Sequence, residues 1–355
     1  MMTKTLKVGL IGLGGISNLH VGGWEASEHA ELVAGSDVNS DVFASWVSRH
    51  GPLRMTDNPQ ELIEDPDIDI IDICTPNNYH AGLAIAALKA GKHVLCEKPL
   101  ASKPEDILRM IEARDQSGKM LMTAQHHRFS GDSKALKAEI DAGNLGSIYH
   151  ARSWMLRRAA APLRPGFIMM AHSGGGPTID IGVHILDLTL WFLGNPRPVA
   201  VSGTVRDDLS KLPGSFSIWG GDIPPEYDVE EFAAAFVRFE NGATLILETS
   251  WLLHHDVPDN QSTDMQMWLY GSGGGAHWPS CKISESNYQT KQLINRQLLL
   301  TQDERRPHHQ EIVEFVQAIV DGNPSPVPAE QSLQVAQILE ATYESQRTGG
   351  EVRIN

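Results

Sequence analysis

Residues 6–17 read LKVGLIGLGGIS, an apolar run followed by a glycine-rich turn, and an amphipathic segment continues from there to about Ser27. A second apolar run, residues 31–37 (ELVAGSD), ends in an acid. Short apolar runs on either side of an amphipathic stretch predict a strand, a helix and a second strand. The stretch therefore predicts a βαβ unit, in which the two strands are parallel.

The same alternation of strands and helices continues to about residue 125. Further strands are expected at 68–74, 93–96 and 120–124, and helices at 41–50, 80–90 and 103–117. Short connections and nearly continuous apolar strands are typical of a parallel sheet covered by helices on both faces. We therefore predict a doubly wound Rossmann domain over residues 1–125.

The pattern changes after residue 126, where strand-like segments dominate. They lie at 147–154, 199–205, 231–239, 243–251 and 265–270, with helices expected at 133–142, 178–193, 309–320 and 330–346. Asn241-Gly242 between two of the runs is a strong hairpin signal. We predict a second α/β domain over residues 126–355, built on a large, open, mainly antiparallel sheet. Its last helix is expected to be able to pack back on the first domain.

The composition excludes some classes of function. The chain has 355 residues and a formal net charge of −15, which argues against a nucleic-acid partner because phosphates require a basic surface. Its three cysteines have no metal-ligand spacing. No run reaches the roughly 18 apolar residues of a membrane span. We expect a cytoplasmic enzyme with no membrane partner.

The glycine loop, Gly12-x-Gly14-x-x-Ser17, lies between a strand and a helix, as the dinucleotide fingerprint requires. The first glycine allows a tight turn, and the second lets backbone N–H groups approach a pyrophosphate at the helix N-terminus. Asp37 can accept hydrogen bonds from the adenosine ribose and repel a 2′-phosphate, which favours NAD over NADP. The alternatives are a glycine turn without a ligand and a role for Asp37 as the cap of the next helix.

Three further residues have the chemistry that a hydroxyl oxidation needs. Lys98 follows a strand and precedes a proline, while Asp180 and His184 lie four apart on an expected helix and so share a face. A histidine can take a proton near neutral pH, and a carboxylate one turn away can orient its ring. Position alone leaves two alternatives open: an exposed surface lysine and a buried structural Asp–His pair. No third ligand has a metal-site spacing, so no metal is expected.

Other candidates are less specific. Thr75-Pro76-Asn77 ends a strand at the sheet edge where ligands bind, and Asn77 can equally be a helix N-cap. His126-His127-Arg128 lies at the domain junction, where substrate pockets are common. Trp154 and Arg157 can line a sugar cleft or be ordinary loop residues.

Several motifs, taken together, resemble the Gfo/Idh/MocA oxidoreductases over nearly the whole chain. They are IGLGGI at 11–16, TPNxxH at 75–80, AGKHVLCEKPLA at 90–101, SGGG at 173–176, DIGVHILDL at 180–188 and WFLG at 191–194. One departure is Ser130-Gly131-Asp132, where many members carry a proline. Because that region often borders the substrate, specificity cannot be copied from any one relative.

The resemblance implies an NAD-dependent dehydrogenase that acts on a sugar, a cyclic polyol such as inositol, or a derivative, or runs the reverse reduction. It also implies a homodimer or homotetramer formed through the large sheet. The catalytic trio falls on Lys98, Asp180 and His184, an inositol-dehydrogenase-like set. The implied cofactor contacts are Gly12, Gly14, Gly15, Ile16, Asp37, Thr75, Pro76, Asn77, His80, Glu97 and Lys98. The implied substrate contacts are Lys98, His127, Arg128, Trp154, Arg157, Asp180 and His184.

Two other functions stay open at this point. Some proteins of this fold are glycosidases that use tightly held NAD for a transient oxidation, and others are sensors that bind the nucleotide without chemistry. Sensors usually lack the catalytic lysine, whereas this chain has Lys98.

Overall fold

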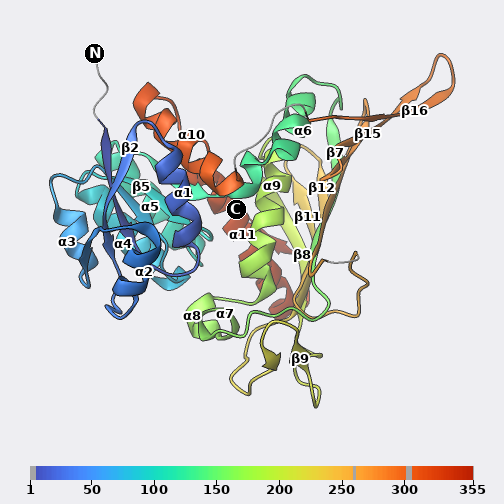
Figure 1. The fold of residues 1–355 in the computed structure, drawn as a ribbon. Helices are drawn as coiled ribbons and strands as arrows, with labels where there is room; N and C mark the ends of the chain where they lie inside the picture. Colours follow the sequence, from blue (N-terminus) through green and yellow to red (C-terminus); the bar gives the residue numbers. More distant parts are fainter. Residues whose placement is uncertain (1–4, 259–260, 301–305, 355) are drawn as a thin grey trace. The chain divides into compact units, whose positions relative to one another are not determined.

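The described residues of this computed structural model, 5–258, 261–300 and 306–354, divide into two units (Figure 1). Unit 1 comprises Met1–Phe129 and Glu304–Leu333, and unit 2 comprises Ser130–Asp303 and Gln334–Asn355. The segment 304–333 thus belongs with the N-terminal unit, which differs from the single boundary at residues 125–126 expected from the sequence. The last helix, α11 (Ala329–Thr348), begins in unit 1 and ends in unit 2.

Unit 1 is built on a six-stranded parallel sheet in the order β3-β2-β1-β4-β5-β6. Its strands are β1 (Leu6–Ile11), β2 (Ala30–Ser36), β3 (Arg54–Thr56), β4 (Ile70–Ile73), β5 (His93–Glu97) and β6 (Leu121–Ala124). Its helices are α1 (Ser17–Ala26), α2 (Val42–His50), α3 (Pro59–Glu64), α4 (Asn77–Lys89), α5 (Pro104–Ser117), the 3-10 helix η1 (His126–Phe129) and α10 (Pro307–Asp321). The doubly wound Rossmann prediction is confirmed. Strand order reverses between β1 and β4, so ligands are expected beyond the carboxyl ends of these strands.

Two elements of unit 1 escaped sequence analysis. Strand β3 has only three residues, none of them fully buried, so it leaves no apolar run to detect. Helix α3 has six residues and begins where the Asn58 side chain accepts the Gln60 N–H, with Pro59 in the first turn. Proline in the first turn and asparagine at the N-cap are common helix starts, but a helix this short has little periodicity.

Helix α10 joins unit 1 because of its apolar face. Ile312, Phe315 and Val316 pack in one core cluster with Trp24 of α1 and Val8 of β1. Burying such side chains contributes roughly 1.5–3 kcal/mol each relative to exposure. The sequence had suggested such packing for the last helix, and the first residues of α11 also belong to unit 1, where the Ser332 hydroxyl lies 2.8 Å from the Thr123 hydroxyl.

Unit 2 is built on a nine-stranded sheet in the order β16-β15-β14-β13-β7-β12-β11-β8-β17. Its strands are β7 (Ile148–Leu156), β8 (Pro198–Arg206), β11 (Phe232–Phe239), β12 (Thr244–Ser250), β13 (Asp264–Gly271), β14 (Gly275–Trp278), β15 (Lys282–Asn287), β16 (Gln292–Gln297) and β17 (Val352–Arg353). Only β7 and β12 pair in parallel among the described strands. The large, mainly antiparallel sheet and the Asn241-Gly242 hairpin between β11 and β12 are as predicted.

Helices pack on one face of this sheet, where Figure 1 shows α9 running along it. The remaining elements are α6 (Gly131–Asp141), α7 (Pro165–Ile168), α8 (Met170–Ser173), the π-helical turn η2 (Thr178–Gly182), α9 (Val183–Leu193), and a two-stranded sheet of β9 (Phe216–Ser217) and β10 (Gly221–Asp222). Leu186 and Leu190 of α9 share a core cluster with Val237 and Leu245 of the sheet. Among the described residues, Figure 1 shows no helix on the opposite face of the sheet, the uncovered face.

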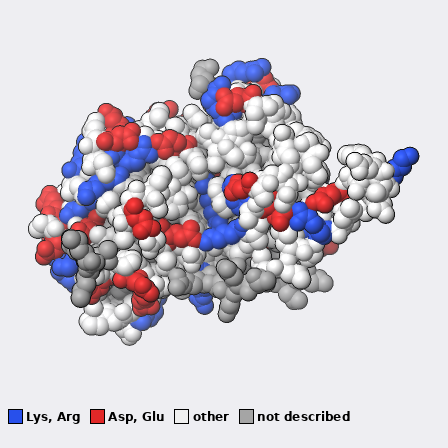
Figure 2. All heavy atoms as spheres, turned by 90° about the horizontal axis from the view of Figure 1, so that it is seen from above, with Lys and Arg blue, Asp and Glu red and all other residues white. Residues whose placement is uncertain are grey.

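Acidic and basic side chains are interspersed over the described residues seen from above (Figure 2). Within the described part of the chain, no helix is both long enough and apolar enough to cross a membrane.

Candidate active site

The glycine loop of unit 1 has the geometry of a phosphate cradle. Gly12 has φ +95°, and a Cβ there would lie 2.6 Å from the Cys74 carbonyl carbon and oxygen, so only glycine fits. A Cβ on Gly14 or Gly15 would meet nothing within 4 Å, so open space lies over the loop. Helix α1 follows, with Ile16 at the N-cap and no side-chain cap hydrogen bond. Such a helix start can receive a dinucleotide pyrophosphate.

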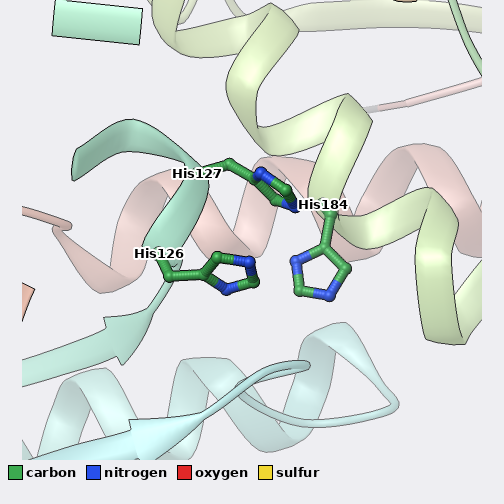
Figure 3. Close-up of side chains that lie close together, drawn as sticks. All are labelled: His126, His127 and His184. Atoms are coloured by element: carbon green, nitrogen blue, oxygen red, sulfur yellow. The ribbon is translucent and has the colours of Figure 1, made fainter. Parts of the chain in front are cut away.

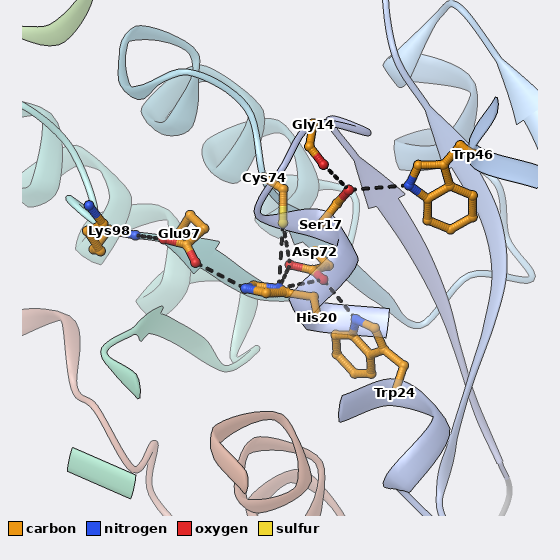
Figure 4. Close-up of polar contacts among 9 residues, drawn as sticks. All are labelled: Gly14, Ser17, His20, Trp24, Trp46, Asp72, Cys74, Glu97 and Lys98. Atoms are coloured by element: carbon orange, nitrogen blue, oxygen red, sulfur yellow. Dashed lines mark hydrogen bonds and ion pairs between the residues drawn. The ribbon is translucent and has the colours of Figure 1, made fainter. Parts of the chain in front are cut away.

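Ser17 takes the place of the third glycine of the fingerprint. Its hydroxyl donates to the Gly14 carbonyl at 2.8 Å and accepts the Trp46 indole N–H at 3.3 Å (Figure 4). The side chain is fully buried. Ser17 thus fits the close packing expected of a small residue and also ties α1 to α2.

Asp37 lies directly after β2, beside the glycine loop. One carboxylate oxygen accepts the Leu13 N–H at 2.9 Å, and the other accepts the Asn39 N–H at 2.9 Å. The carboxylate therefore secures the glycine loop and the turn that follows it, whereas the N-cap of the next helix, α2, is Asp41 rather than Asp37. Each oxygen keeps a second lone pair for a ligand hydroxyl.

The loop after β4 also fits a cofactor. Helix α4 begins at Asn77 with Pro76 as its N-cap and no side-chain cap hydrogen bond, so Asn77 is not the N-cap. The Thr75 hydroxyl is buried and has no hydrogen-bond partner among the described residues. A buried hydroxyl without a partner is costly, and a cofactor amide or hydroxyl would satisfy it.

His80 connects this loop to the segment that carries Lys98. Its Nδ1 lies 2.8 Å from the Pro99 carbonyl oxygen and its Nε2 lies 2.8 Å from the Thr75 carbonyl oxygen. Burial lowers the pKa of His80 despite the two carbonyls. A neutral ring donates to one of them, so His80 braces the two loops rather than carrying a charge.

Lys98 begins the loop after β5, at the same sheet edge as the glycine loop. Its backbone N–H donates to Glu97 Oε2 at 2.9 Å, and the second Glu97 oxygen lies 3.1 Å from His20 Nε2 (Figure 4). Burial acts to raise the pKa of Glu97, but the hydrogen bond and the charge of His20 outweigh it and lower the pKa. Glu97 is therefore an ionised anchor for the Lys98 backbone. Both of its carboxylate oxygens bond to protein groups, so its side chain is not positioned as a cofactor contact.

Sequence analysis missed the buried cluster behind this anchor. His20 Nδ1 lies 3.0 and 3.1 Å from the two oxygens of Asp72, which also accepts the Trp24 indole N–H at 2.8 Å. Burial acts to lower the pKa of His20, but the Asp72 carboxylate outweighs it and the pKa lies well above its usual range. With a carboxylate at each ring nitrogen, His20 is an imidazolium that donates on both sides.

Glu311 of α10 closes the cluster from another element. Neither of its carboxyl oxygens has a hydrogen-bond partner among the described residues. Burial raises the pKa of Glu311 well above its usual range, which favours the protonated acid. The neutral form avoids a third buried negative charge beside Asp72 and Glu97.

The same cluster raises the question of a metal. One ligand atom each from His20, Asp72 and Cys74 lies within 4.8 Å of the others. The His20–Asp72 hydrogen bonds already occupy this space, and burial raises the pKa of Cys74, which keeps the thiol protonated. Because metals bind the thiolate, we interpret the group as a hydrogen-bonded charge cluster.

Helix η1 carries the His126-His127-Arg128 motif at the end of unit 1. Figure 3 shows His126 and His127 extending from η1, and the His126 ring stacks on His308 of α10 at 3.8 Å between centroids. Arg128 is buried and donates to Gln331 Oε1 at 2.6 Å. Arg128 therefore connects η1 to α11, whereas the two histidines keep their candidate role.

In unit 2, Asp180 and His184 lie on one continuous helical segment. Asp180 lies in the π-helical turn η2, and His184 extends from the first turn of α9 (Figure 3). The expected helix over 178–193 is present and ends at Gly194 in the left-handed conformation. Its first turn is π-helical, a local distortion that is frequent at functional sites.

A buried glutamate holds the loop that leads into η2, and sequence analysis missed it. Glu230 accepts the Gly176 N–H at 2.9 Å, the Thr178 N–H at 3.1 Å and the Tyr343 hydroxyl at 2.8 Å. A Cβ on Gly176 would lie 2.1 Å from the Glu230 carbonyl oxygen, and one on Gly175 2.2 Å from the Tyr343 hydroxyl. The glycine run is therefore required by close packing on Glu230 and Tyr343.

The structure separates the two residues expected to line a sugar cleft. Arg157 Nη1 lies 3.9 Å from Asp180 Oδ2, so this residue is close to the catalytic candidates of unit 2. Trp154 donates to Asp264 Oδ2 at 2.7 Å and pairs in register with Glu248 and Gln266. Its neighbours Ser153 and Met155 are buried, and Met155 shares the core cluster of α9, so Trp154 lies on the face away from α9.

Comparison with known proteins agrees with this geometry. Residues 6–125 match the family model described as "Oxidoreductase family, NAD-binding Rossmann fold", and residues 133–277 match the "GFO/IDH/MocA C-terminal domain". Unit 1 therefore contains an NAD-binding domain of the oxidoreductase class, in agreement with the fit of its glycine loop.

Individual relatives define the family. The chain is 31% identical to D-glucoside 3-dehydrogenase of Escherichia coli (strain K12), over 100% of this chain and 99% of the relative. It is 31% identical to myo-inositol 2-dehydrogenase of Thermotoga maritima, over 69% of this chain and 68% of the relative. The structure of levoglucosan dehydrogenase in complex with NADH and levoglucosan shares the fold, with TM-score 0.84 and 23% identity over 99% of this chain and 100% of that chain. The protein belongs to the GFO/IDH/MocA family of oxidoreductases.

Proposed function

We propose that this NAD-dependent oxidoreductase oxidises a secondary hydroxyl of a sugar, a cyclic polyol such as an inositol, or a derivative, or catalyses the reverse reduction. The observation that carries the proposal is the placement of Lys98. It lies at the sheet edge of the glycine loop, with its backbone fixed by Glu97. The activities of the relatives, on glucosides and on myo-inositol, support this class of substrate.

Each unit supplies part of the chemistry. His184 takes the hydroxyl proton as the carbon that bears it becomes a carbonyl, which is general-base catalysis. Lys98 donates a hydrogen bond to the same oxygen and stabilises its developing negative charge. Asp180 orients His184 or passes the proton on. Bound NAD accepts the hydride that the carbon loses.

We assign the dinucleotide to the loop residues of unit 1. Gly12, Gly14, Gly15 and Ile16 would hold the pyrophosphate, and Asp37 would accept hydrogen bonds from the ribose hydroxyls. Thr75, Pro76, Asn77 and His80 line the loop after β4. The negative charge of Asp37 disfavours a 2′-phosphate. Turnover with NADP equal to or better than with NAD would contradict the assignment of Asp37.

A substrate panel tests the proposal directly. Inositols, aldoses, glucosides and anhydrosugars are incubated with the purified protein and NAD, and NADH formation is followed by absorbance. We expect NADH with at least one member. Cleavage of a glucoside with no net NADH would instead indicate the glycosidase reaction, and NAD binding without any conversion would indicate a sensor.

We further propose that the protein is a homodimer or homotetramer formed through the uncovered face of the large sheet. The side chains that point to this face include Trp154, Phe236, Trp268 and Tyr270. Aromatic side chains of this kind are enriched in protein interfaces. They are carried on adjacent strands, so a second copy could cover them together.

Light scattering after gel filtration tests the assembly. Trp268→Glu should shift the protein toward the monomer, because it replaces a large aromatic side chain of this face with a charged one. Tyr288→Glu, on the exposed β15–β16 hairpin, is the matched control and should not change the mass. A monomeric wild-type protein would contradict the proposal.

We also propose a cytoplasmic location. The three cysteines are buried and form no disulfide, which agrees with a reducing compartment. Fractionation of the source cells, with detection by antibody, tests it.

A further inference from the structure

The connection between β8 and β11 exposes apolar side chains near the proposed substrate site of unit 2. Residues 207–231 form this connection and include β9 and β10. Leu212, Phe216, Ile218 and Trp219 are all exposed, Trp219 to 48%. Exposed apolar groups concentrated in one short segment are uncommon on soluble proteins and often mark binding sites.

The turn that carries Trp219 is fixed in place. Ser217 is buried and its hydroxyl donates to the Ala161 carbonyl at 2.7 Å, while the Ile218 N–H donates to the Ala159 carbonyl at 2.8 Å. The Trp219 N–H donates in turn to the Ser217 hydroxyl at 3.2 Å. The indole is therefore presented from an ordered backbone, and a ligand that binds it loses little affinity to ordering of the turn.

A single arginine connects Trp219 to the catalytic candidates. The Arg157 guanidinium stacks on the Trp219 ring, 4.6 Å from its centroid, and its Nη1 lies 3.9 Å from Asp180 Oδ2. Among the described residues it also donates to the Thr263 hydroxyl at 3.2 Å and the Ala160 carbonyl at 3.4 Å. Since a guanidinium has five N–H donors, it can still bond ligand hydroxyls.

We propose that Trp219 and Arg157 form a subsite for the substituent of a glycosidic substrate, adjacent to the ring whose hydroxyl is oxidised. This proposal rests on the proposed function, because it places the reacting ring at Asp180 and His184. One guanidinium group separates Trp219 from Asp180, so the indole lies beside the reacting ring rather than at its reacting hydroxyl. Arg157 bonds hydroxyls near the glycosidic linkage, and Trp219 stacks against the ring of the substituent.

The chemistry of the subsite favours a second ring over a free sugar. An indole offers a large apolar face with one polar edge, and such faces pack against sugar or aryl rings. A free monosaccharide that reaches Asp180 leaves the Trp219 indole uncovered. The preferred substrates are therefore disaccharides or aryl glycosides, whose second ring covers the indole while the first ring is oxidised.

Kinetics of Trp219→Ala on two substrates test the subsite. With p-nitrophenyl β-D-glucoside, KM should rise about tenfold, equivalent to ~1.4 kcal/mol of lost binding. With free D-glucose, which does not cover Trp219, the KM of the variant should differ from that of the wild type by less than about twofold. Trp219→Phe should recover part of the loss, and Ile218→Ala, the exposed neighbour in the same turn, should match the wild type on both substrates.

Each outcome decides the proposal. Equal changes in KM for the two substrates, or no change for either, would contradict the subsite while leaving the sugar oxidation intact. A Trp219→Ala protein with a lower oligomeric mass and unchanged KM would show that a second copy covers the indole, which also contradicts it. If the wild type oxidises no sugar, the proposed function fails, and calorimetric titration of the NADH-loaded protein with the aryl glucoside still decides the subsite.

Discussion

The loop after β5 in unit 1 and the η2 segment in unit 2 each present catalytic candidates, but different interactions hold them. Lys98 follows a central strand and is anchored through Glu97 to the buried imidazolium of His20. Asp180 lies on a π-helical turn that a glycine loop leads into, and Glu230 holds that loop. The cofactor side is thus fixed by a sheet and buried charges, whereas the substrate side is fixed by loops. Loops tolerate variation, so substrate choice is expected to change there first.

The largest expected effect lies on the substrate side. His184→Ala removes the proposed general base and should lower kcat by about 10²–10⁴-fold. Binding of NADH, followed by fluorescence, should be unaffected because the glycine loop is intact. Undiminished turnover would overturn the role of His184.

Replacing Lys98, on the cofactor side, should lower kcat somewhat less than replacing His184. Lys98→Met keeps the length of the side chain but removes the donor to the reacting oxygen, which typically costs about 10²–10³ in kcat. Glu97 and its buried partners are unchanged, so the melting temperature should stay near that of the wild type. A variant that loses NAD affinity with unchanged kcat would show that Lys98 serves the cofactor instead.

Gly176→Ala tests how tightly the substrate-side loop is packed. The new Cβ meets the Glu230 carbonyl oxygen at 2.1 Å, so the loop must shift. Overpacking of this kind costs roughly 1–3 kcal/mol. The loss should appear in calorimetry as a melting temperature lower by several degrees. Gly166→Ala is the control. Its Cβ would meet nothing within 4 Å, so the melting temperature should equal that of the wild type.

The smallest effect concerns the acid that closes the buried cluster of unit 1. Burial raises the pKa of Glu311 well above its usual range. A raised folded-state pKa gives stability that is complete below the unfolded pKa, about 4.3, and is lost as pH rises through the folded pKa. Glu311→Gln does not titrate, so its melting temperature relative to the wild type should rise from pH 5 to pH 8.

The exposed control for this comparison is Glu105→Gln on α5, which removes the same charge from the surface. A difference between Glu311→Gln and wild type that is constant with pH would mean that Glu311 is ionised like a surface acid. The NADH affinity of Glu311→Gln should equal that of the wild type, because Glu311 is not among the residues proposed to bind the cofactor.

Sequence analysis succeeded where the signal is local. The glycine loop, the alternation of strands and helices, the Asn241-Gly242 hairpin and the helix ending at Gly194 all depend on neighbouring residues. Elements without such a signal were missed: β3 is too short, and β9 and β10 have two residues each. Trp154 was expected near the substrate, but the two-residue repeat of β7 places it on the opposite face from α9.

The sequence by itself determined the fold class, the NAD-binding loop and the identity of the three catalytic candidates, because each is written in short contiguous motifs. Only the tertiary structure decided what holds them in place. His20 meets Asp72 and Glu97 across 52 and 77 residues, and Glu230 meets Gly176 across 54. The stacking of Arg157 on Trp219 is of the same kind. Such contacts follow from how distant segments pack in space, and no spacing along the chain encodes them.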